Sequence, residues 1–192
     1  MSLRRWEQLS EELLVRYKVF DVVKARRRSP RTGAEIGFFL VRTWNWVNVV
    51  ALTDARELIL VRQYRHGPET FTLEIPGGLI DGNGETPIDA AIRELREESG
   101  FVARSMQPLG SVNPNPALFG NRCHTFLATG CTRAGALQQD PGEDMEVVLV
   151  PIAEAERMAA RGELDHALVL AGLYLWRLSL DAQGAVPATT VE

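Results

Sequence analysis

Residues 77–101 read GGLIDGNGETPIDAAIRELREESGF, a glycine-rich loop followed by the signature of a helix. Thr86 is a favourable N-cap residue, and Pro87 suits the first helical position because its missing N–H would have no partner there. Gly100 is placed to end the helix in the left-handed conformation that a C-terminal cap often needs. This stretch therefore predicts a helix over residues 87–99, entered from a loop with few bulky side chains.

The predicted helix carries two different faces at about 100° per residue. Ile88, Ile92 and Leu95, with Ala91 beside them, share one side, which we expect to face a hydrophobic core. Three carboxylates gather on another side, from Glu94, Glu97 and Glu98.

Like charges at this spacing repel one another, so a bound divalent cation with oxygen ligands would stabilise the acidic face. The alternative is a solvated acidic face partly neutralised by Arg93 and Arg96. The neighbouring glycine loop favours the cation, because small residues let backbone approach a metal–phosphate group closely.

The same stretch resembles the Nudix box. Glu85, seven residues, and then Arg93-Glu94-Leu95-Arg96-Glu97-Glu98-Ser99-Gly100-Phe101 fit the pattern without a gap, whereas six residues instead of five separate Gly78 from Glu85. The resemblance implies an α/β fold, an α/β/α sandwich with a mixed β-sheet and an N-terminal β-hairpin region. We expect the additional residue to be absorbed in the turn over residues 81–84, where glycines tolerate unusual dihedral angles.

Composition limits the classes of function. The chain has 192 residues, 45% of them hydrophobic and 24% charged, which is typical of a globular protein. A net charge of −4 argues against nucleic acid as a partner, because no basic excess is available to neutralise phosphates. Two cysteines, Cys123 and Cys131, make no disulfide framework, and no apolar run is long enough to span a membrane. We therefore expect a cytoplasmic protein without a membrane contact.

Hydrophobic patterns predict the remaining elements and three regions. Residues 1–43 are expected to form an N-terminal arm or short helix (1–14) and a β-hairpin (17–24 and 35–42) around a basic turn. Residues 44–180 are expected to form the Nudix hydrolase domain, and residues 181–192 a loose tail. Within the domain we expect strands at 44–52, 57–65, 71–75, 122–128 and 146–150, and two further helices at 151–161 and 166–180.

Two segments resemble the ADP-ribose pyrophosphatase branch of the family. They are residues 61–65 (VRQYR) and 74–81 (EIPGGLID). The resemblance implies that Arg65 contacts the substrate diphosphate, although a surface arginine on a strand is the alternative. It also implies a preference for ADP-ribose or sugar nucleotides, which a proline at a certain distance beyond the box marks in the family. Pro114 and Pro116 both lie near that distance. Trp46, with Trp44, either stacks on the substrate base or fills the core beneath the sheet.

The resemblance assigns the metal and catalytic roles as well. Mg²⁺, for which Mn²⁺ can substitute, would be held by the carboxylates of Glu94, Glu97 and Glu98 and by the backbone carbonyl of Gly77. Arg93 would orient Glu97 or Glu98, and Glu85 would support the substrate site from the start of the helix. Glu143 is assigned as the general base, with Asp144 and Glu146 as alternatives. The histidines His66, His124 and His166 have no zinc-ligand spacing.

We therefore expect a Mg²⁺-dependent hydrolase of ADP-ribose or a related nucleoside diphosphate sugar, yielding a nucleoside monophosphate and a sugar phosphate. Other nucleotides, such as GDP-mannose or a dinucleoside polyphosphate, are the first alternative. A non-catalytic nucleotide sensor is the second, which the complete set of box glutamates argues against. The branch resemblance also implies a homodimer, with the N-terminal region serving dimerisation and base binding.

Overall fold

The computed structural model describes residues 2–136 and 144–182, and the chain divides into two compact units. The N-terminal unit consists of Met1–Asn45 together with Asn113–Arg122. The larger unit consists of Trp46–Val112 together with Cys123–Glu192. Each unit is described by itself.

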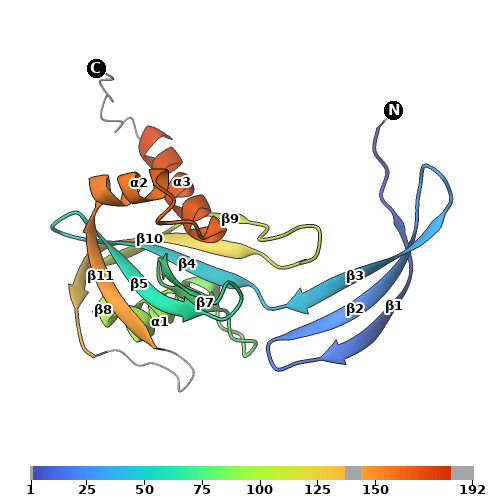
Figure 1. Cartoon of the computed structure of the whole chain (residues 1–192), viewed down its shortest axis with the longest axis horizontal. Helices are drawn as coiled ribbons and strands as arrows, with labels where there is room; N and C mark the ends of the chain where they lie inside the picture. The colour runs from blue at the N-terminus through green and yellow to red at the C-terminus, as the bar shows by residue number, and fades with distance from the viewer. Residues whose placement is uncertain (1, 137–143, 183–192) are drawn as a thin grey trace. The chain divides into compact units, whose positions relative to one another are not determined.

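The larger unit is built on a mixed sheet (Figure 1). Its main path runs β11-β5-β4-β10-β8, where β4 and β10 are parallel and the other neighbours are antiparallel. Three further strands extend it, with β6 pairing with β5, β7 with β4 and β9 with β10. The strand bounds are β4 Trp46–Thr53, β5 Glu57–Arg65, β6 Thr70–Glu74, β7 Gly77–Leu79, β8 Phe101–Val102, β9 Ser105–Val112, β10 Cys123–Arg133 and β11 Met145–Pro151.

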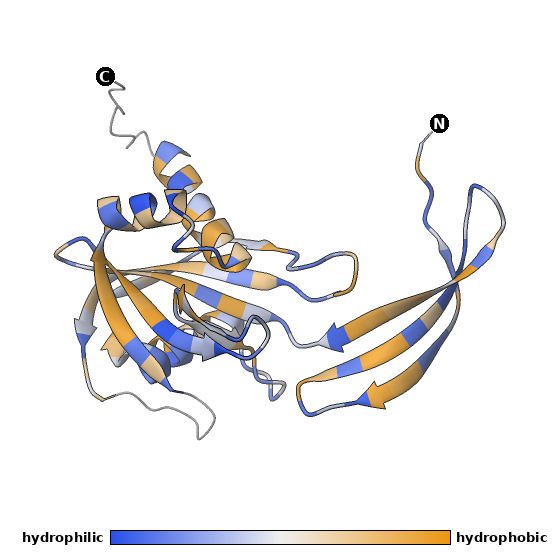
Figure 2. Ribbon diagram, in the orientation of Figure 1, coloured by the Kyte–Doolittle hydropathy of each residue, from blue (hydrophilic) through white to orange (hydrophobic). Residues whose placement is uncertain are grey.

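Helices cover both faces of this sheet. One core joins α1 (Pro87–Ser99) to the sheet through side chains such as Leu95, Val49 and Phe126. The second core lies on the opposite face, beneath α2 (Ile152–Ala160) and α3 (Ala167–Ala182). Figure 2 shows hydrophobic residues concentrated along the strands between these helices. The expected α/β/α layering and mixed sheet are confirmed.

The caps of α1 form as its sequence predicts, but the buried face of the helix differs. The Thr86 hydroxyl accepts a hydrogen bond from the Asp89 N–H at 3.3 Å, and Gly100 ends the helix with φ 72°. The expectation that Ile88 and Ile92 face the core is wrong, because they are 37% and 50% exposed. The buried positions are instead Ala90, Ala91, Leu95, Glu98 and Ser99. Two small alanines let the helix axis approach the sheet closely, which turns the isoleucines outward and Glu98 inward.

The N-terminal unit contains a three-stranded antiparallel sheet in the order β1-β2-β3. The strands are β1 Glu7–Arg16, β2 Phe20–Arg28 and β3 Glu35–Thr43. The predicted hairpin is present, but the short helix considered for residues 1–14 is wrong, because residues 7–16 form a strand. These residues pair with β2, because an extended partner with open backbone groups lies beside them.

Residues 113–122 join the N-terminal unit although they lie far from it in sequence. The Val41 N–H donates to the Leu118 carbonyl at 2.9 Å, and Val41 forms a parallel bridge with Phe119. At the other end of the chain, Asp181 and Ala182 belong to α3, whereas residues 183–192 of the predicted tail lie outside the described residues. In the described part of the chain, no helix combines the length and hydrophobicity needed to cross a membrane.

Candidate functional site

Arg93 gathers the carboxylates at the start and on one side of α1. Its Nε and Nη2 donate to the two oxygens of Glu85 at 2.8 and 3.1 Å. Its Nη1 donates to Glu94 at 2.8 Å and to Glu97 at 2.9 Å, and Nη2 also reaches the Leu79 carbonyl at 3.0 Å. One guanidinium therefore bridges three carboxylates and the loop that precedes the helix.

This network explains how the acidic face is tolerated. The hydrogen bond from Arg93 lowers the pKa of Glu85 most strongly, and Glu85 in turn raises the pKa of Arg93 well above its ordinary range. Of the two arginines expected to neutralise the acidic face, Arg93 does so through these hydrogen bonds. Charge-assisted bonds from one guanidinium offset the repulsion expected among Glu85, Glu94 and Glu97 and keep their oxygens together.

Glu98 is held apart from this network. It is 5% exposed, and its Oε2 accepts a hydrogen bond from the Gly77 N–H at 2.9 Å. The adjacent Gly78 lies directly against the Glu94 carboxylate, so a Cβ at this position would collide with that side chain. The predicted close approach of the glycine loop to the acidic helix is therefore present, and it brings Gly77, Glu94 and Glu98 to one side of the larger unit.

The donor atoms are suited to a hard divalent cation. Within residues 2–136 and 144–182, no three His, Cys, Asp or Glu side chains already converge as a metal-binding group. Mg²⁺ is usually held by one or two carboxylates together with waters and substrate phosphates, so a preformed protein cage is unnecessary. Glu94 and Glu98 beside the backbone of Gly77 offer oxygen ligands of this type, and Glu97 lies on the same side of α1 with a more exposed carboxylate.

Arg65 ends β5 and forms a two-point ion pair with Glu74 at the end of β6. The Arg65 Nε and Nη2 donate to the two Glu74 oxygens, each at 2.7 Å. The Glu74 side chain is 6% exposed, whereas that of Arg65 is 44% exposed. Arg65 is thus an exposed arginine on a strand, as the alternative describes it, but a buried carboxylate fixes the orientation of its guanidinium.

The other predicted substrate residues lie in different places. Trp46 begins β4, where it pairs with Leu79 and Cys123 and is partly buried, while Trp44 is 54% exposed in the N-terminal unit. Glu143 lies outside the described residues. The alternatives Asp144 and Glu146 are exposed, and Glu146 lies 3.8 Å from Arg62 across β11 and β5.

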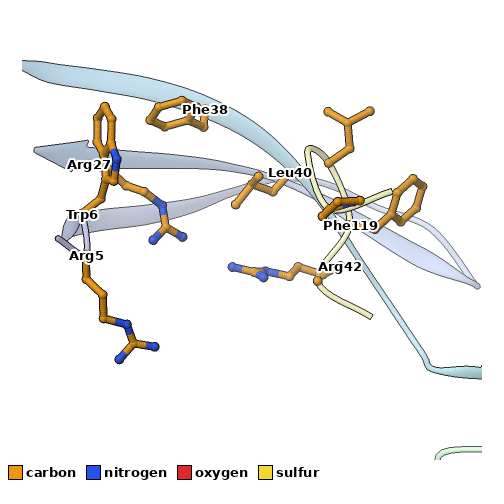
Figure 3. Close-up of a pocket in the computed structure, with 10 residues that line it drawn as sticks. Arg5, Trp6, Arg27, Phe38, Leu40, Arg42 and Phe119 are labelled. Carbon is orange, nitrogen blue, oxygen red and sulfur yellow. The ribbon is translucent and has the colours of Figure 1, made fainter. Parts of the chain in front are cut away.

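Pro116 lines a cavity of about 540 Å³ in the N-terminal unit (Figure 3). Aromatic rings and arginines share its wall, and Trp6 packs edge-on against Phe38 with ring centroids 5.5 Å apart. Figure 3 shows the Arg27 and Arg42 guanidiniums near the apolar side chain of Leu40. The lining residues are Arg5, Trp6, Arg27, Phe38, Leu40, Arg42, Pro116, Leu118, Phe119 and Gly120.

Sequence reasoning missed two sets of residues. Glu74 was missed as the partner of Arg65, and so were Thr72 and His166, which lie beside Glu74. No local sequence pattern joins residues 72–74 to residue 166. The cavity residues other than Pro116 were also missed, because they come from the segment before β1, from β2 and β3, and from the distant segment Asn113–Arg122. The alternation of Phe38, Leu40 and Arg42 along β3 places them on one face and was the available signal.

Comparisons with known proteins agree with this geometry. The NUDIX domain model matches residues 43–173. An ADP-ribose pyrophosphatase of Mycobacterium tuberculosis is 33% identical over 174 residues, covering 90% of this chain and 84% of that protein. A methanol dehydrogenase activator of Bacillus methanolicus is 30% identical over 138 residues, covering 71% and 74%. A solved structure of an ADP compounds hydrolase matches with a TM-score of 0.84 at 29% identity, covering 97% of this chain and 100% of that one.

Proposed function

The chain belongs to the NUDIX domain family, and on this premise we propose that it hydrolyses the diphosphate of ADP-ribose or a related nucleoside diphosphate sugar. The products would be a nucleoside monophosphate and a sugar phosphate. The observation that carries the proposal is the gathering of Glu85, Glu94 and Glu97 by Arg93 beside the Gly77–Gly78 backbone. The names of the pyrophosphatase and hydrolase relatives support the same substrate class.

A divalent metal is the cofactor that members of this family generally need, and we propose Mg²⁺, with Mn²⁺ as a substitute. Glu94, Glu98, Glu97 and the Gly77 carbonyl would hold it. When bound, it would neutralise diphosphate charge and increase the acidity of a coordinated water. Arg93 keeps the carboxylates in place through hydrogen bonds that it already makes.

Two further residues act on the substrate in this proposal. Arg65 would donate to diphosphate oxygens, for which a planar guanidinium is well suited. Glu143 would accept the proton of the attacking water as the general base, with Asp144 and Glu146 as the alternatives.

We propose that the chain forms a homodimer and that the N-terminal cavity binds the substrate base, with Pro116 in its wall and Trp46 near the substrate in the larger unit. Aromatic and arginine side chains suit a base that is attached to anionic phosphates. Several large apolar side chains of the N-terminal sheet are exposed, among them Phe39 at 60% and Leu13 at 46%, and a second copy would cover them. Both cysteines are free and buried, which supports a reducing compartment such as the cytoplasm.

The dimer is tested by light scattering coupled to gel filtration. A Phe39→Glu variant should shift the protein from dimer to monomer, because a charge at an apolar contact is poorly tolerated. A wild-type protein that is monomeric at micromolar concentration would reject the dimer.

The function is tested by product analysis with Mg²⁺ across ADP-ribose, GDP-mannose, UDP-glucose and a nucleoside triphosphate. We expect AMP and ribose 5-phosphate from ADP-ribose. Cleavage of the triphosphate alone would reject the nucleotide-sugar assignment but leave a pyrophosphohydrolase. Tight binding of ADP-ribose without turnover would favour a nucleotide-binding regulator instead. One relative is named as an activator of another enzyme, methanol dehydrogenase.

A further inference from the structure

Glu74 is a buried carboxylate that accepts several hydrogen bonds. It is 5% exposed, and it accepts from Arg65 Nε and Nη2 and from the Thr72 hydroxyl, each at 2.7 Å. Burial alone would raise its pKa, but the hydrogen bonds from Arg65 and Thr72 and the nearby positive charge lower the pKa instead. A buried anion is unfavourable unless it is paired, so Glu74 and Arg65 depend on each other.

His166 adds a third element to this pair. Its Nδ1 accepts the Leu168 N–H at 3.3 Å in the first turn of α3, and its Nε2 lies 3.9 Å from Glu74 Oε2. Because Nδ1 accepts, the hydrogen-bond pattern assigns the proton of the neutral ring to Nε2, which faces the carboxylate. Glu74 is therefore approached from β5, from its own strand β6 and from the start of α3.

The pair fixes the plane of the Arg65 guanidinium. A guanidinium presents its N–H groups in one rigid plane, and Glu74 engages the edge formed by Nε and Nη2. The edge that carries Nη1 consequently points away from Glu74. Since the Arg65 side chain is 44% exposed and Glu74 only 6%, the held edge is the buried one.

We propose that Glu74 is a positioning residue for substrate binding, holding Arg65 so that its outer edge is presented to the diphosphate. The inference rests on the proposed function, because it takes the substrate to be a nucleoside diphosphate sugar. The Thr72 hydroxyl in turn holds Glu74 by a hydrogen bond, and His166 lies beside it. Without Glu74 the long arginine side chain would sample several rotamers, and the binding of each substrate molecule would have to order it again.

A double-mutant cycle tests this role. ADP-ribose hydrolysis with Mg²⁺ is measured for Glu74→Gln, Arg65→Ala and the double variant. Glutamine keeps the shape of Glu74 but turns an amide N–H₂ toward a guanidinium N–H, so we expect KM to rise about tenfold with kcat changed much less. In the Arg65→Ala background, Glu74→Gln should raise KM no further, because there is no guanidinium left to position.

Glu163→Gln is the matched control. Arg161 makes the same two-point contact with Glu163, at 2.6 and 3.2 Å, on the exposed segment between α2 and α3. Its loss should leave KM and kcat unchanged. Thermal unfolding of each variant shows whether that variant is folded. Thr72→Val is a milder change, because it removes only one hydrogen bond to Glu74. Should Glu74→Gln not fold, Thr72→Val should still raise KM, and only when Arg65 is present.

The outcomes are distinguishable. Additive effects of Arg65→Ala and Glu74→Gln on KM, or a loss confined to kcat, would overturn the positioning role while the proposed function stands. A wild-type protein that hydrolyses no nucleoside diphosphate sugar would reject the proposed function and this inference together.

Discussion

The two units of the chain differ in charge. The N-terminal unit carries eleven lysines and arginines against five acidic residues, whereas the larger unit carries ten against twenty. Their net formal charges are therefore +6 and −10, a contrast that the overall value of −4 conceals. The basic unit supplies the arginine-lined cavity, which attracts anionic groups, and the acidic unit supplies the box carboxylates, which attract a cation.

Arginine also has a different environment in the two units. In the N-terminal sheet, Arg28 bonds to Glu7 at 2.7 Å and to Glu35 at 2.8 Å, but all three side chains are substantially exposed. In the larger unit, Arg93 bonds to Glu85 and Glu94, whose side chains are only 15% and 13% exposed. Exposed ion pairs contribute little because water and salt screen them, whereas partly buried pairs fix positions. The comparison teaches that the function of an arginine–glutamate network depends on burial more than on the number of bonds.

The largest effect should come from the acidic unit. Glu98→Gln removes the charge of the buried carboxylate beside Gly77, and we expect turnover to fall by about 10³-fold because the diphosphate charge is no longer neutralised. Mg²⁺ affinity, measured by calorimetry, should fall as well. Glu143→Gln should reduce turnover by a similar factor but leave Mg²⁺ affinity nearly intact.

The control lies in the basic unit. Glu12 is exposed on β1, and Glu12→Gln changes the total charge by the same amount as Glu98→Gln. Turnover and Mg²⁺ affinity should stay at the wild-type level. If Glu98→Gln behaved like this control, the acidic side of α1 would have no part in catalysis.

The sequence predicted the elements that depend on local signals. Thr86, Pro87 and Gly100 determine the ends of α1 through their own backbone chemistry, so its bounds were correct. The same holds for β5, where a continuous β-rich pattern ends at Arg65. The box carboxylates were found because their spacing within one helix is itself the signal.

Features set by distant partners could not be predicted. Which side of α1 is buried depends on how closely Ala90 and Ala91 let it approach the sheet, and this decides the exposure of Ile88 and Ile92. β1 became a strand because β2 lies beside it. Glu74 and His166 are 92 residues apart in numbering and meet only in the folded chain, which is why sequence reasoning treated His166 as an isolated histidine.

An effect of intermediate size is expected on the free energy of unfolding, which should depend on the Arg93 network far more than on the Arg28 network. Arg93→Met would leave the partly buried carboxylates of Glu85 and Glu94 without their common donor, and we expect a loss of about 3 kcal/mol in the free energy of unfolding. Arg28→Met breaks two ion pairs on the exposed sheet, against three for Arg93→Met, but should change stability little. Urea titration of both variants measures the difference. Equal losses would show that burial does not distinguish the networks.

The smallest effect should be the dependence of stability on acid. The pKa of Glu74 is lowered from its ordinary value of 4.5 in the folded state, because hydrogen bonds and positive charge outweigh its burial. Such a group stabilises the fold at pH values above its unfolded pKa, and this contribution is lost as the pH falls through the folded pKa. The difference in unfolding free energy between wild type and Glu74→Gln should therefore be constant near neutral pH and shrink below about pH 4.5.

Glu35 of the N-terminal unit provides the contrast for this last measurement. Its pKa is also lowered, chiefly by a hydrogen bond from Arg28, but the pair is exposed and salt will screen it. Urea unfolding at pH 3 to 7 should therefore show an acid-dependent difference in unfolding free energy between wild type and Glu74→Gln. This difference should persist in about 0.5 M salt, where the screening length is shorter than the roughly 10 Å found at 0.1 M. The corresponding difference for Glu35→Gln should nearly vanish. If salt removed both differences equally, the Arg65–Glu74 pair would be no better shielded than a surface pair, and its proposed positioning role would lose its physical basis.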